Sequence, residues 1–308
     1  MSIPTLQSVL AQGQLLAPDV FDGISTRAAE TLGCKTARLS AQAMTHTVHG
    51  TPDEGTLSAT ELVWSLSRMT EDNCNLPLIV EVRSGFSDNL RIMPYDLTRV
   101  IKAGAAALLL DDRKFGCGSD SETQELVSPS LFAQKVAAAV EAAANTDCMV
   151  LARSYAADPA DAIMRCQNAV DAGAEMVGAA CMHTEADAVC FAAAIPGAKL
   201  WSDLSVKDGR PEVSAEYLQE LGYGLVFITF MEKAAWFGDM DYGIKNFANR
   251  NTVYADLHDF DGLLRDETGN LVDYHVIFSY WKKWMPLEKE FQNLSELGDQ
   301  ACQGGCKA

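Results

Sequence analysis

One local pattern recurs along the sequence: a helix-like stretch ends in a small residue and glycine, and a short apolar run follows. It occurs at residues 32–40 (LGCKTARLS), 103–112 (AGAAALLLDD), 172–180 (AGAEMVGAA) and 221–230 (LGYGLVFITF). Glycine suits the left-handed residue that ends many helices, and a short apolar run suits a strand buried on both faces. The pattern therefore predicts repeated parallel βαβ units.

Eight apolar runs are predicted strands, at residues 17–21, 36–40, 78–82, 107–111, 148–152, 175–179, 198–202 and 225–229. Helical segments are predicted between them and after the last, at 24–32, 58–73, 90–102, 128–144, 159–171, 184–194, 212–220 and 231–248. Eight alternating pairs fit a TIM-type (β/α)₈ barrel. An open doubly wound sheet is the alternative, although no GxGxxG motif follows the first strand. We assign 1–250 to the barrel and 251–308 to a C-terminal helical extension, whose aromatic residues predict packing on the barrel or a neighbouring subunit.

Composition excludes several classes of function. The 308 residues are 48% hydrophobic and 21% charged, as in ordinary globular proteins. The net charge of −18 disfavours nucleic-acid and anionic-membrane partners. No run is long enough to span a bilayer, and the first residues do not resemble a signal peptide. With nine cysteines, an odd number, in largely apolar surroundings, we expect a cytoplasmic protein with reduced thiols.

Acids and arginines gather at the predicted strand ends, where TIM barrels place their active sites. Acids alone would indicate a divalent cation, whereas arginines alone would indicate a clamp for carboxylate or phosphate. This sequence has both, so the residues leave the two interpretations open. The candidate residues at these ends are Ser40, Ala41, Gln42, Glu81, Arg83, Asp111, Arg153 and Asp203.

The loop after the fourth strand is long, polar and rich in glycine, at residues 113–130 (RKFGCGSDSETQELVSPS). Such a loop is typical of a mobile lid over an active site. Cys117 stands between two glycines and close to Arg113 and Lys114, where a thiol can acquire a lowered pKa and exchange a proton. A loop thiol without function is the alternative. Another loop carries His46 and His49, which predict either a metal pair or ordinary loop packing.

Three longer stretches carry a family resemblance. Residues 37–87 resemble a segment that begins with a strand ending in Ser-Gly and ends in an Asp-Ala-Asp-x-Gly motif. Residues 101–112 (IKAGAAALLLDD) resemble an AGA…IEDQ strand, and 149–156 (MVLARSYA) an ARTDA strand. In this order and spacing, the motifs resemble the isocitrate lyase/phosphoenolpyruvate mutase superfamily from about residue 15 to 230, and within it most closely the 2-methylisocitrate lyases.

The resemblance implies a (β/α)₈ barrel, usually tetrameric, that exchanges its C-terminal helix between neighbours. It also implies an enzyme that cleaves or forms a C–C or C–P bond next to an α-oxo-carboxylate, with Mg²⁺ stabilising the enolate. We therefore expect a carbon–carbon lyase for a small oxo- or 2-hydroxy-carboxylate, acting as a homotetramer. The alternatives are an α-oxo-acid decarboxylase or hydrolase, a phosphonate-processing enzyme, and a catalytically silent relative that binds a metabolite.

Positions matched to the family give expected roles. The backbone amides of Ser40, Ala41 and Gln42 would bind the oxo-acid, and Arg153 would clamp a carboxylate. Asp53, Arg83 and Asp203 would complete the substrate site. Glu81 and Asp111 would hold the metal, and Cys117 would exchange the proton.

The sequence departs from the family pattern at the metal site and in the lid. Glu81 and Arg83 stand where the family has the two acids of Asp-Ala-Asp, so one acid is longer and the other is replaced by a cation. Because Mg²⁺ binding needs concentrated negative charge, we expect it to be weak here. The lid is three residues shorter before Cys117, and Ser119 replaces its histidine.

Overall fold

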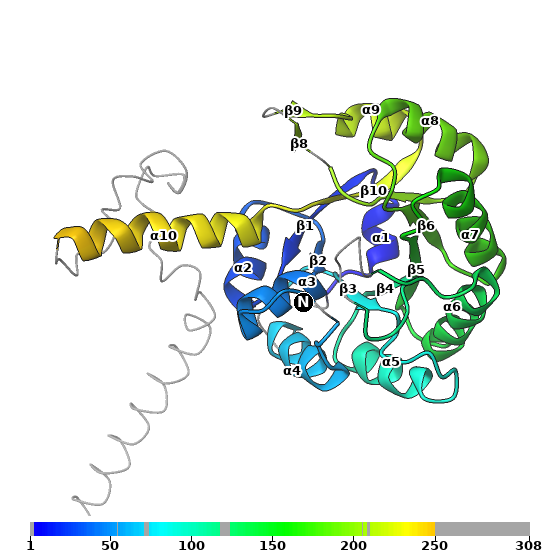
Figure 1. Ribbon diagram of the computed structural model, residues 1–308, viewed down its shortest axis with the longest axis horizontal. Coiled ribbons are helices and arrows are strands. Elements are labelled where there is room, and N and C mark those ends of the chain that lie inside the picture. Colours follow the sequence, from blue (N-terminus) through cyan, green and yellow to red (C-terminus); the bar gives the residue numbers. More distant parts are fainter. Residues whose placement is uncertain are drawn as a thin grey trace, which may run out of the picture. The chain divides into compact units, whose positions relative to one another are not determined.

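Eight parallel strands close into a barrel in the order β1, β10, β7, β6, β5, β4, β3, β2 (Figure 1). This computed structural model describes residues 3–53, 55–70, 74–117, 124–204, 206–207 and 210–249. The barrel strands are β1 (Leu15–Val20), β2 (Ala37–Leu39), β3 (Leu78–Arg83), β4 (Ala107–Asp111), β5 (Met149–Ser154), β6 (Met176–Ala179), β7 (Lys199–Trp201) and β10 (Tyr223–Ile228). The predicted TIM-type barrel is confirmed, and every predicted strand overlaps an observed one.

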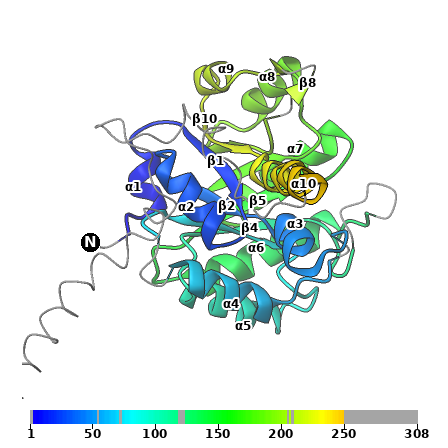
Figure 2. The same ribbon diagram turned by 90° about the vertical axis from the view of Figure 1, so that its left-hand side faces the viewer.

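Helices surround the barrel, with α4 and α5 on one side and α8 and α9 on the opposite side (Figures 1 and 2). They are α2 (Gly23–Thr31), α4 (Ala59–Thr70), α5 (Met93–Lys102), α6 (Pro129–Ala143), α7 (Pro159–Asp171), α8 (Glu185–Ala194), α9 (Ala215–Glu220) and α10 (Met231–Asn249). The recurring glycines end helices as expected: Gly33, Gly104, Gly173 and Gly222 have φ of 80°, 103°, 103° and 82°. A side chain is strained in this left-handed region, so glycine is favoured there.

Four further elements were not predicted. They are α1 (Leu6–Leu10), α3 (Ala41–Met44), a π-helical turn (Thr45–His49) and a hairpin of β8 (Val206–Lys207) and β9 (Arg210–Pro211). Leu6 and Val9 of α1 join a buried cluster with residues of the barrel strands, among them Leu15 and Ile79. Such side chains fill the interior of a TIM barrel, so a site at the carboxyl ends of the strands lies over a closed, packed core.

Chain contacts divide the molecule into residues 1–241 and 242–308, and α10 crosses that boundary. The predicted extension at 251–308 lies outside the described residues, so its helical character and its packing stay predictions. Within the part of the chain that the structure describes, no helix combines the length and the apolar composition needed to cross a bilayer.

Candidate active site at the carboxyl ends of the strands

A buried ion pair joins the ends of β3 and β5. Arg153 Nη2 donates to Glu81 Oε1, and the backbone N–H of Ala41 donates to Glu81 Oε2 with an N···O distance of 3.0 Å. Burial alone would raise the pKa of Glu81, but the guanidinium groups of Arg153, Arg38 and Arg113 outweigh it and hold that pKa below its usual range. Glu81 is therefore an ionised carboxylate surrounded by cations.

A second ion pair lies at the end of β4. Arg113 donates to Asp111 Oδ2 from Nε at 3.1 Å and from Nη2 at 2.6 Å, and its backbone N–H donates to Oδ1 at 3.1 Å. The strand register places Asp111 beside Arg153. Burial would raise the pKa of Asp111, but Arg113 in particular lowers it. Both oxygens of this predicted metal ligand are thus engaged by Arg113.

Arg83 connects two loops at the end of β3. Its Nη1 donates to Asp53, and its Nη2 donates to the backbone oxygen of Cys117 at 2.9 Å. Glu81 and Arg83 are two residues apart on β3, so on a regular strand their side chains would share a face. They do not pair with each other, because the register shifts between them and Arg83 has φ of 53°, which breaks the alternation. Burial and the nearby Arg113 lower the pKa of Arg83 to about 10, so it is cationic at neutral pH.

Arg38, on β2, is a fourth arginine at this end of the barrel, which the sequence reading did not select. Its guanidinium lies 4.8 Å from the ring centre of Phe227, and its Nη2 donates to Thr229 Oγ1 at 3.0 Å. Asp203, predicted to bind substrate, accepts from the backbone N–H of Thr229 at 3.1 Å. Asp19, also missed, accepts from the backbone N–H groups after β10. A charged residue inside a short apolar strand was the available signal for Arg38 and Asp19.

The residues predicted to bind an oxo-acid through their backbone amides begin α3. Ser40 Oγ accepts from the Ala43 N–H at 3.2 Å and so caps this helix. The amide of Ala41 already donates to Glu81, and the side chain of Gln42 is exposed. The three residues therefore lie at the correct edge, but the Ala41 amide also orients a carboxylate of the site.

Tyr155 lies between two arginines of the site, and its role was also missed. Its ring centre is 4.1 Å from the guanidinium carbon of Arg113 and 4.8 Å from that of Arg153. Asp112 fixes this segment, because it accepts from the Tyr155 N–H at 2.8 Å and from Ser154 Oγ at 2.7 Å. Burial raises the pKa of Asp112. The aromatic ring spaces the two guanidinium groups and stabilises both.

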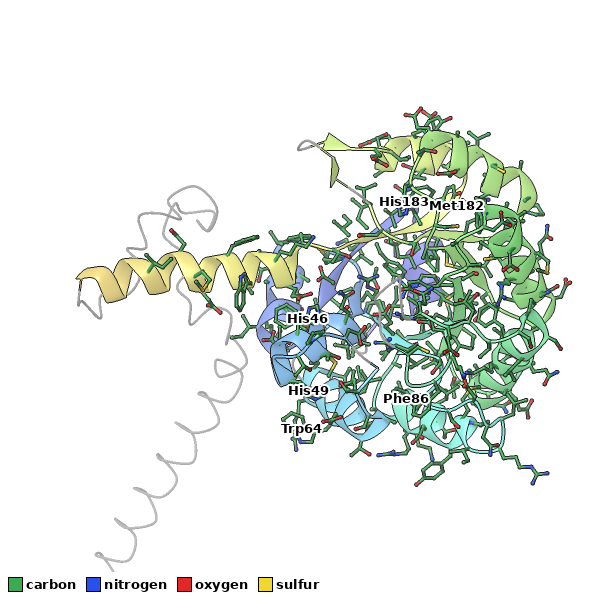
Figure 3. The ribbon with its side chains drawn as sticks, viewed as in Figure 1. His46, His49, Trp64, Phe86, Met182 and His183 are labelled. Atoms are coloured by element: carbon green, nitrogen blue, oxygen red, sulfur yellow. The ribbon has the colours of Figure 1, made fainter. Side chains whose placement is uncertain are left out.

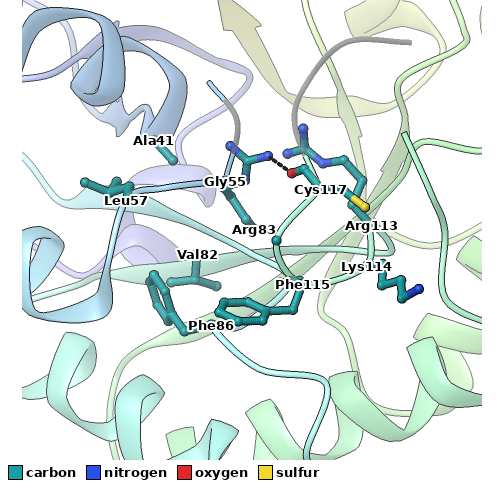
Figure 4. Close-up of a pocket in the computed structure, with 12 residues that line it drawn as sticks. Ala41, Gly55, Leu57, Val82, Arg83, Phe86, Arg113, Lys114, Phe115 and Cys117 are labelled. Atoms are coloured by element: carbon teal, nitrogen blue, oxygen red, sulfur yellow. Dashed lines mark hydrogen bonds between the residues drawn. The ribbon is translucent and has the colours of Figure 1, made fainter. Parts of the chain in front are cut away.

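Cys117 and the residues just before it line a small pocket with an interior volume of about 20 Å³ (Figure 4). Arg83, Arg113 and Cys117 line the pocket together, and Figure 4 shows both guanidinium groups beside the backbone of Cys117. Cys117 is half-buried. A Cβ at Gly55 would lie 2.9 Å from the Cys117 backbone oxygen, so the two loops approach as closely as a glycine permits.

The two loop histidines do not form a metal pair. His46 Nδ1 contacts Glu232, and His49 Nε2 lies 3.1 Å from Glu61 Oε1. Figure 3 labels the two histidines. Each histidine therefore holds a glutamate of a different helix, which corresponds to the loop-packing alternative.

The sequence profile of the phosphoenolpyruvate phosphomutase family matches residues 6–241. The chain belongs to this family. The predicted membership of the isocitrate lyase/phosphoenolpyruvate mutase superfamily is therefore confirmed. Its curated relatives include a probable 2-methylisocitrate lyase 1 of Corynebacterium glutamicum, 27% identical over 86% of this chain and 89% of the relative. They also include a 2,3-dimethylmalate lyase of Eubacterium barkeri, 26% identical over 89% of this chain and 90% of the relative. These names agree with the expectation of a carbon–carbon lyase.

A solved phosphonopyruvate hydrolase, in complex with oxalate and Mg²⁺, shares the fold with a TM-score of 0.73 and 20% identity, covering 90% of this chain and 95% of that one. The donor set of this phosphomutase-family chain does not fit such an ion. Among the described residues, no group of three or more His, Cys, Asp or Glu side chains could hold a metal. Glu81 and Asp111 are each engaged by a guanidinium, whereas Mg²⁺ requires free oxygen ligands.

Electrostatics disfavours the ion further. The charge of Arg113 acts on both predicted ligands, Glu81 and Asp111, and that of Arg83 acts on Asp111. One unit charge at about 4 Å from a divalent cation costs about 8 kcal/mol at an effective dielectric constant of 20. Glu81 and Asp111, the predicted Mg²⁺ ligands, lie on neighbouring strands. Each of them is paired with an arginine.

Proposed function

We propose that this protein is a lyase that cleaves or forms a C–C bond next to an α-oxo- or 2-hydroxy-carboxylate, in the manner of 2-methylisocitrate lyases. The observation that carries the proposal is the set of buried arginines at the carboxyl ends of the strands, two of which, Arg83 and Arg113, line one pocket with Cys117. A carboxylate substrate needs such cations, because each charge-assisted hydrogen bond both holds it and orients it.

Arg153 is the proposed clamp for the substrate carboxylate. Its Nη2 donates to Glu81, while its buried Nε has no hydrogen-bond partner among the described residues. A buried donor without a partner costs free energy, which a substrate oxygen would recover. Glu81 fixes the orientation of Arg153 and is a positioning residue in this proposal.

Bond cleavage then requires two proton movements. As the hydroxyl of a 2-hydroxy-carboxylate gives its proton to a solvent water at the mouth of the pocket, its oxygen forms the carbonyl of an oxo-acid and the adjacent C–C bond breaks. The electron pair of that bond remains on the departing fragment as an enolate, which takes a proton from the Cys117 thiol. Cationic guanidinium groups around the pocket stabilise the negative charge that develops in the transition state.

A second candidate function is hydrolysis or decarboxylation of an α-oxo acid. It passes through the same kind of enolate and needs the same cations, and the fold shared with a phosphonopyruvate hydrolase favours it. A third is binding without turnover, which the ion pairs engaging Glu81 and Asp111 favour.

Product analysis tests the three candidates together. The purified full chain is incubated separately with 2-methylisocitrate, 2,3-dimethylmalate and oxaloacetate, and all organic-acid products are measured by mass spectrometry. A lyase releases pyruvate from one of the first two substrates. From oxaloacetate, decarboxylation gives pyruvate and CO₂, whereas hydrolysis gives oxalate and acetate.

Matched variants assign the roles. Cys117→Ser should lower kcat by about 10² to 10⁴ and change KM less, since the proton moves only in the transition state. Arg153→Lys should raise KM, because lysine lacks the planar fork. Arg99→Gln, on the outer helix α5, is the control and should change neither. The lyase proposal fails if neither hydroxy-acid is cleaved.

A further inference from the structure

Two cations disturb the metal site that the family resemblance implies: Arg83 replaces one expected ligand, and Arg113 engages both oxygens of Asp111, another expected ligand. Arg83 reaches the pocket from the end of β3, and Arg113 reaches it from the loop after β4. Figure 4 shows the two guanidinium groups close together beside Cys117. We infer that Arg83 and Arg113 together replace the divalent cation, and that the site binds a dianionic oxo-carboxylate without metal. The inference rests on the proposed function for its substrate class, but its test is independent of turnover.

The ion pairs at the site do not exhaust the hydrogen-bond donors of the arginines. A guanidinium has five N–H donors. Arg113 uses Nε and Nη2 on Asp111, and no described residue accepts from its Nη1. Buried Nε atoms of Arg38 and Arg153 likewise have no partner in the described part of the chain. Of these three residues, Arg113 lines the pocket, so its Nη1 can donate to an oxygen of a small dianion bound there.

The lining of the pocket carries a cationic surplus: Arg83, Arg113 and Lys114 belong to it, and no carboxylate does among the described residues. The guanidinium groups of Arg38, Arg83, Arg113 and Arg153 face the carboxylates of Asp53, Glu81 and Asp111. A fourth carboxylate, Asp19, is held by backbone N–H groups after β10. The ring of Tyr155 lies against the guanidinium groups of both Arg113 and Arg153. It keeps these two cations apart, so each can bind a different substrate oxygen.

The backbone is strained where it positions one of these cations. Arg83 has φ of 53°, a conformation that costs a non-glycine residue free energy and persists only where its surroundings impose it. Here the conformation directs the guanidinium to Asp53 and to the Cys117 backbone oxygen, away from Glu81. Arg83 thus places its positive charge at the pocket and binds the backbone of the loop that carries Cys117.

Oxalate is a suitable probe, because it is a small dianion that resembles the acid end of an oxo-carboxylate. Isothermal titration calorimetry of the full chain with oxalate is carried out in EDTA and again with Mg²⁺, using the concentration of free oxalate. We expect the dissociation constants to agree within about two-fold. Arg83→Gln and Arg113→Gln should each weaken binding about ten-fold, as expected for one lost charge-assisted contact. Arg99→Gln, remote from the pocket, should bind as the wild type does.

Three results would overturn the inference: oxalate that binds only with Mg²⁺, oxalate that does not bind under either condition, and binding that both glutamine variants leave unchanged. If Arg83→Gln fails to fold, as judged by circular dichroism, Arg83→Lys takes its place and should weaken binding through loss of the fork geometry. Oxalate bound in EDTA without any turnover would remove the proposed lyase and keep the metal-free site. Turnover that requires Mg²⁺ would do the reverse.

Discussion

Lys135 on α6 donates its Nζ to Asp88 Oδ1 at 2.6 Å, although the lysine side chain is completely buried. Asp88 also accepts the backbone N–H of Phe115, at 3.1 and 3.3 Å from its two oxygens. The carboxylate of Asp88 therefore links the loop that carries Cys117 to the loop after β3. Lys135 holds this carboxylate in place from α6. Phe115 belongs to the lining of the pocket, whereas Asp88 and Lys135 are not among its described lining residues.

Substitution of Asp88 should loosen the lid. Asp88→Asn keeps an oxygen that can accept from Phe115 but loses the charge opposite Lys135, whereas Asp88→Ala loses both. We expect iodoacetamide to label Cys117 several-fold faster in the alanine variant than in the asparagine variant. Both should be less stable by about 3–5 kcal/mol, because a buried lysine loses its partner. Equal labelling rates in the two variants would show that the Phe115 contact does not hold the lid.

In the wild type, Cys117 should be the first thiol to react. Burial raises the pKa of five others, which keeps them protonated: Cys34, Cys74, Cys148 (to about 12), Cys166 and Cys181. Cys117 instead lines a pocket with Arg113 and Lys114. Brief iodoacetamide labelling and peptide mapping provide the measurement, with exposed Cys190 as the internal reference.

Oxalate should slow the labelling of Cys117 and leave that of Cys190 unchanged, since only Cys117 lies at the anion pocket. Protection of both thiols would indicate a general effect on the protein, and protection of neither would place the anion elsewhere. Cys302 and Cys306 lie outside the described residues, and their labelling before Cys117 would contradict the assignment of the lid.

The stability of the protein should fall in acid. Glu81 and Asp111 have lowered pKa values in the folded state, so they stabilise it above their unfolded pKa values of about 4.3 and 3.9. That contribution is lost as the pH falls through the lower, folded values. Asp112 acts in the opposite sense, because its raised pKa favours the folded state on protonation. It is one carboxylate against four, since the pKa values of Glu61 and Asp187 are also lowered. Urea unfolding at pH 7 and below pH 4 measures the net effect.

Glu81→Gln tests the origin of this acid sensitivity. It leaves Arg153 buried without its charge partner, so it should cost about 3–5 kcal/mol at pH 7 and flatten the loss in acid. Asp96→Asn removes a partly exposed pair with Arg99 and should cost no more than about 1 kcal/mol. An unchanged acid dependence in Glu81→Gln would assign the effect to other carboxylates.

Mg²⁺ should bind the wild type weakly, because Arg83 places a positive charge beside the predicted ligands. Arg83→Asp replaces it by a carboxylate close to Asp53 and should tighten Mg²⁺ binding in a calorimetric titration, provided that the remaining site is intact. Tight binding of Mg²⁺ by the wild type would contradict this prediction. Binding that Arg83→Asp leaves unchanged would show that this side chain does not face the ion.

The barrel could be predicted from sequence because its signals are local. A glycine after each of four helices and an apolar run after it fix the order of elements, and the ends of parallel strands share one edge. That rule alone brings Glu81, Asp111 and Arg153 together. Which acid pairs with which arginine at this edge could not be predicted, because it depends on the direction of each side chain. Arg83, for example, turns away from Glu81 because of its backbone conformation. Arg38 and Asp19 were missed because they are single charges inside short apolar runs.

The protein should form a homo-oligomer, most simply a dimer or a tetramer. Trp236, Phe237 and Met240 of α10 have 66%, 67% and 46% of their surface exposed, and an apolar patch of large side chains is unusual on a monomer. Light scattering of the full chain should give a multiple of its 33.3 kDa mass.

Trp236→Ser combined with Phe237→Ser should lower the mass of the oligomer, since burying two such aromatic rings stabilises an interface by several kcal/mol. Trp64→Ser, which alters a tryptophan of α4 that is 64% exposed, is the matched control and should keep the oligomer. A full-length monomer at micromolar concentration would refute the prediction, and an unchanged mass in the double variant would remove α10 from the interface.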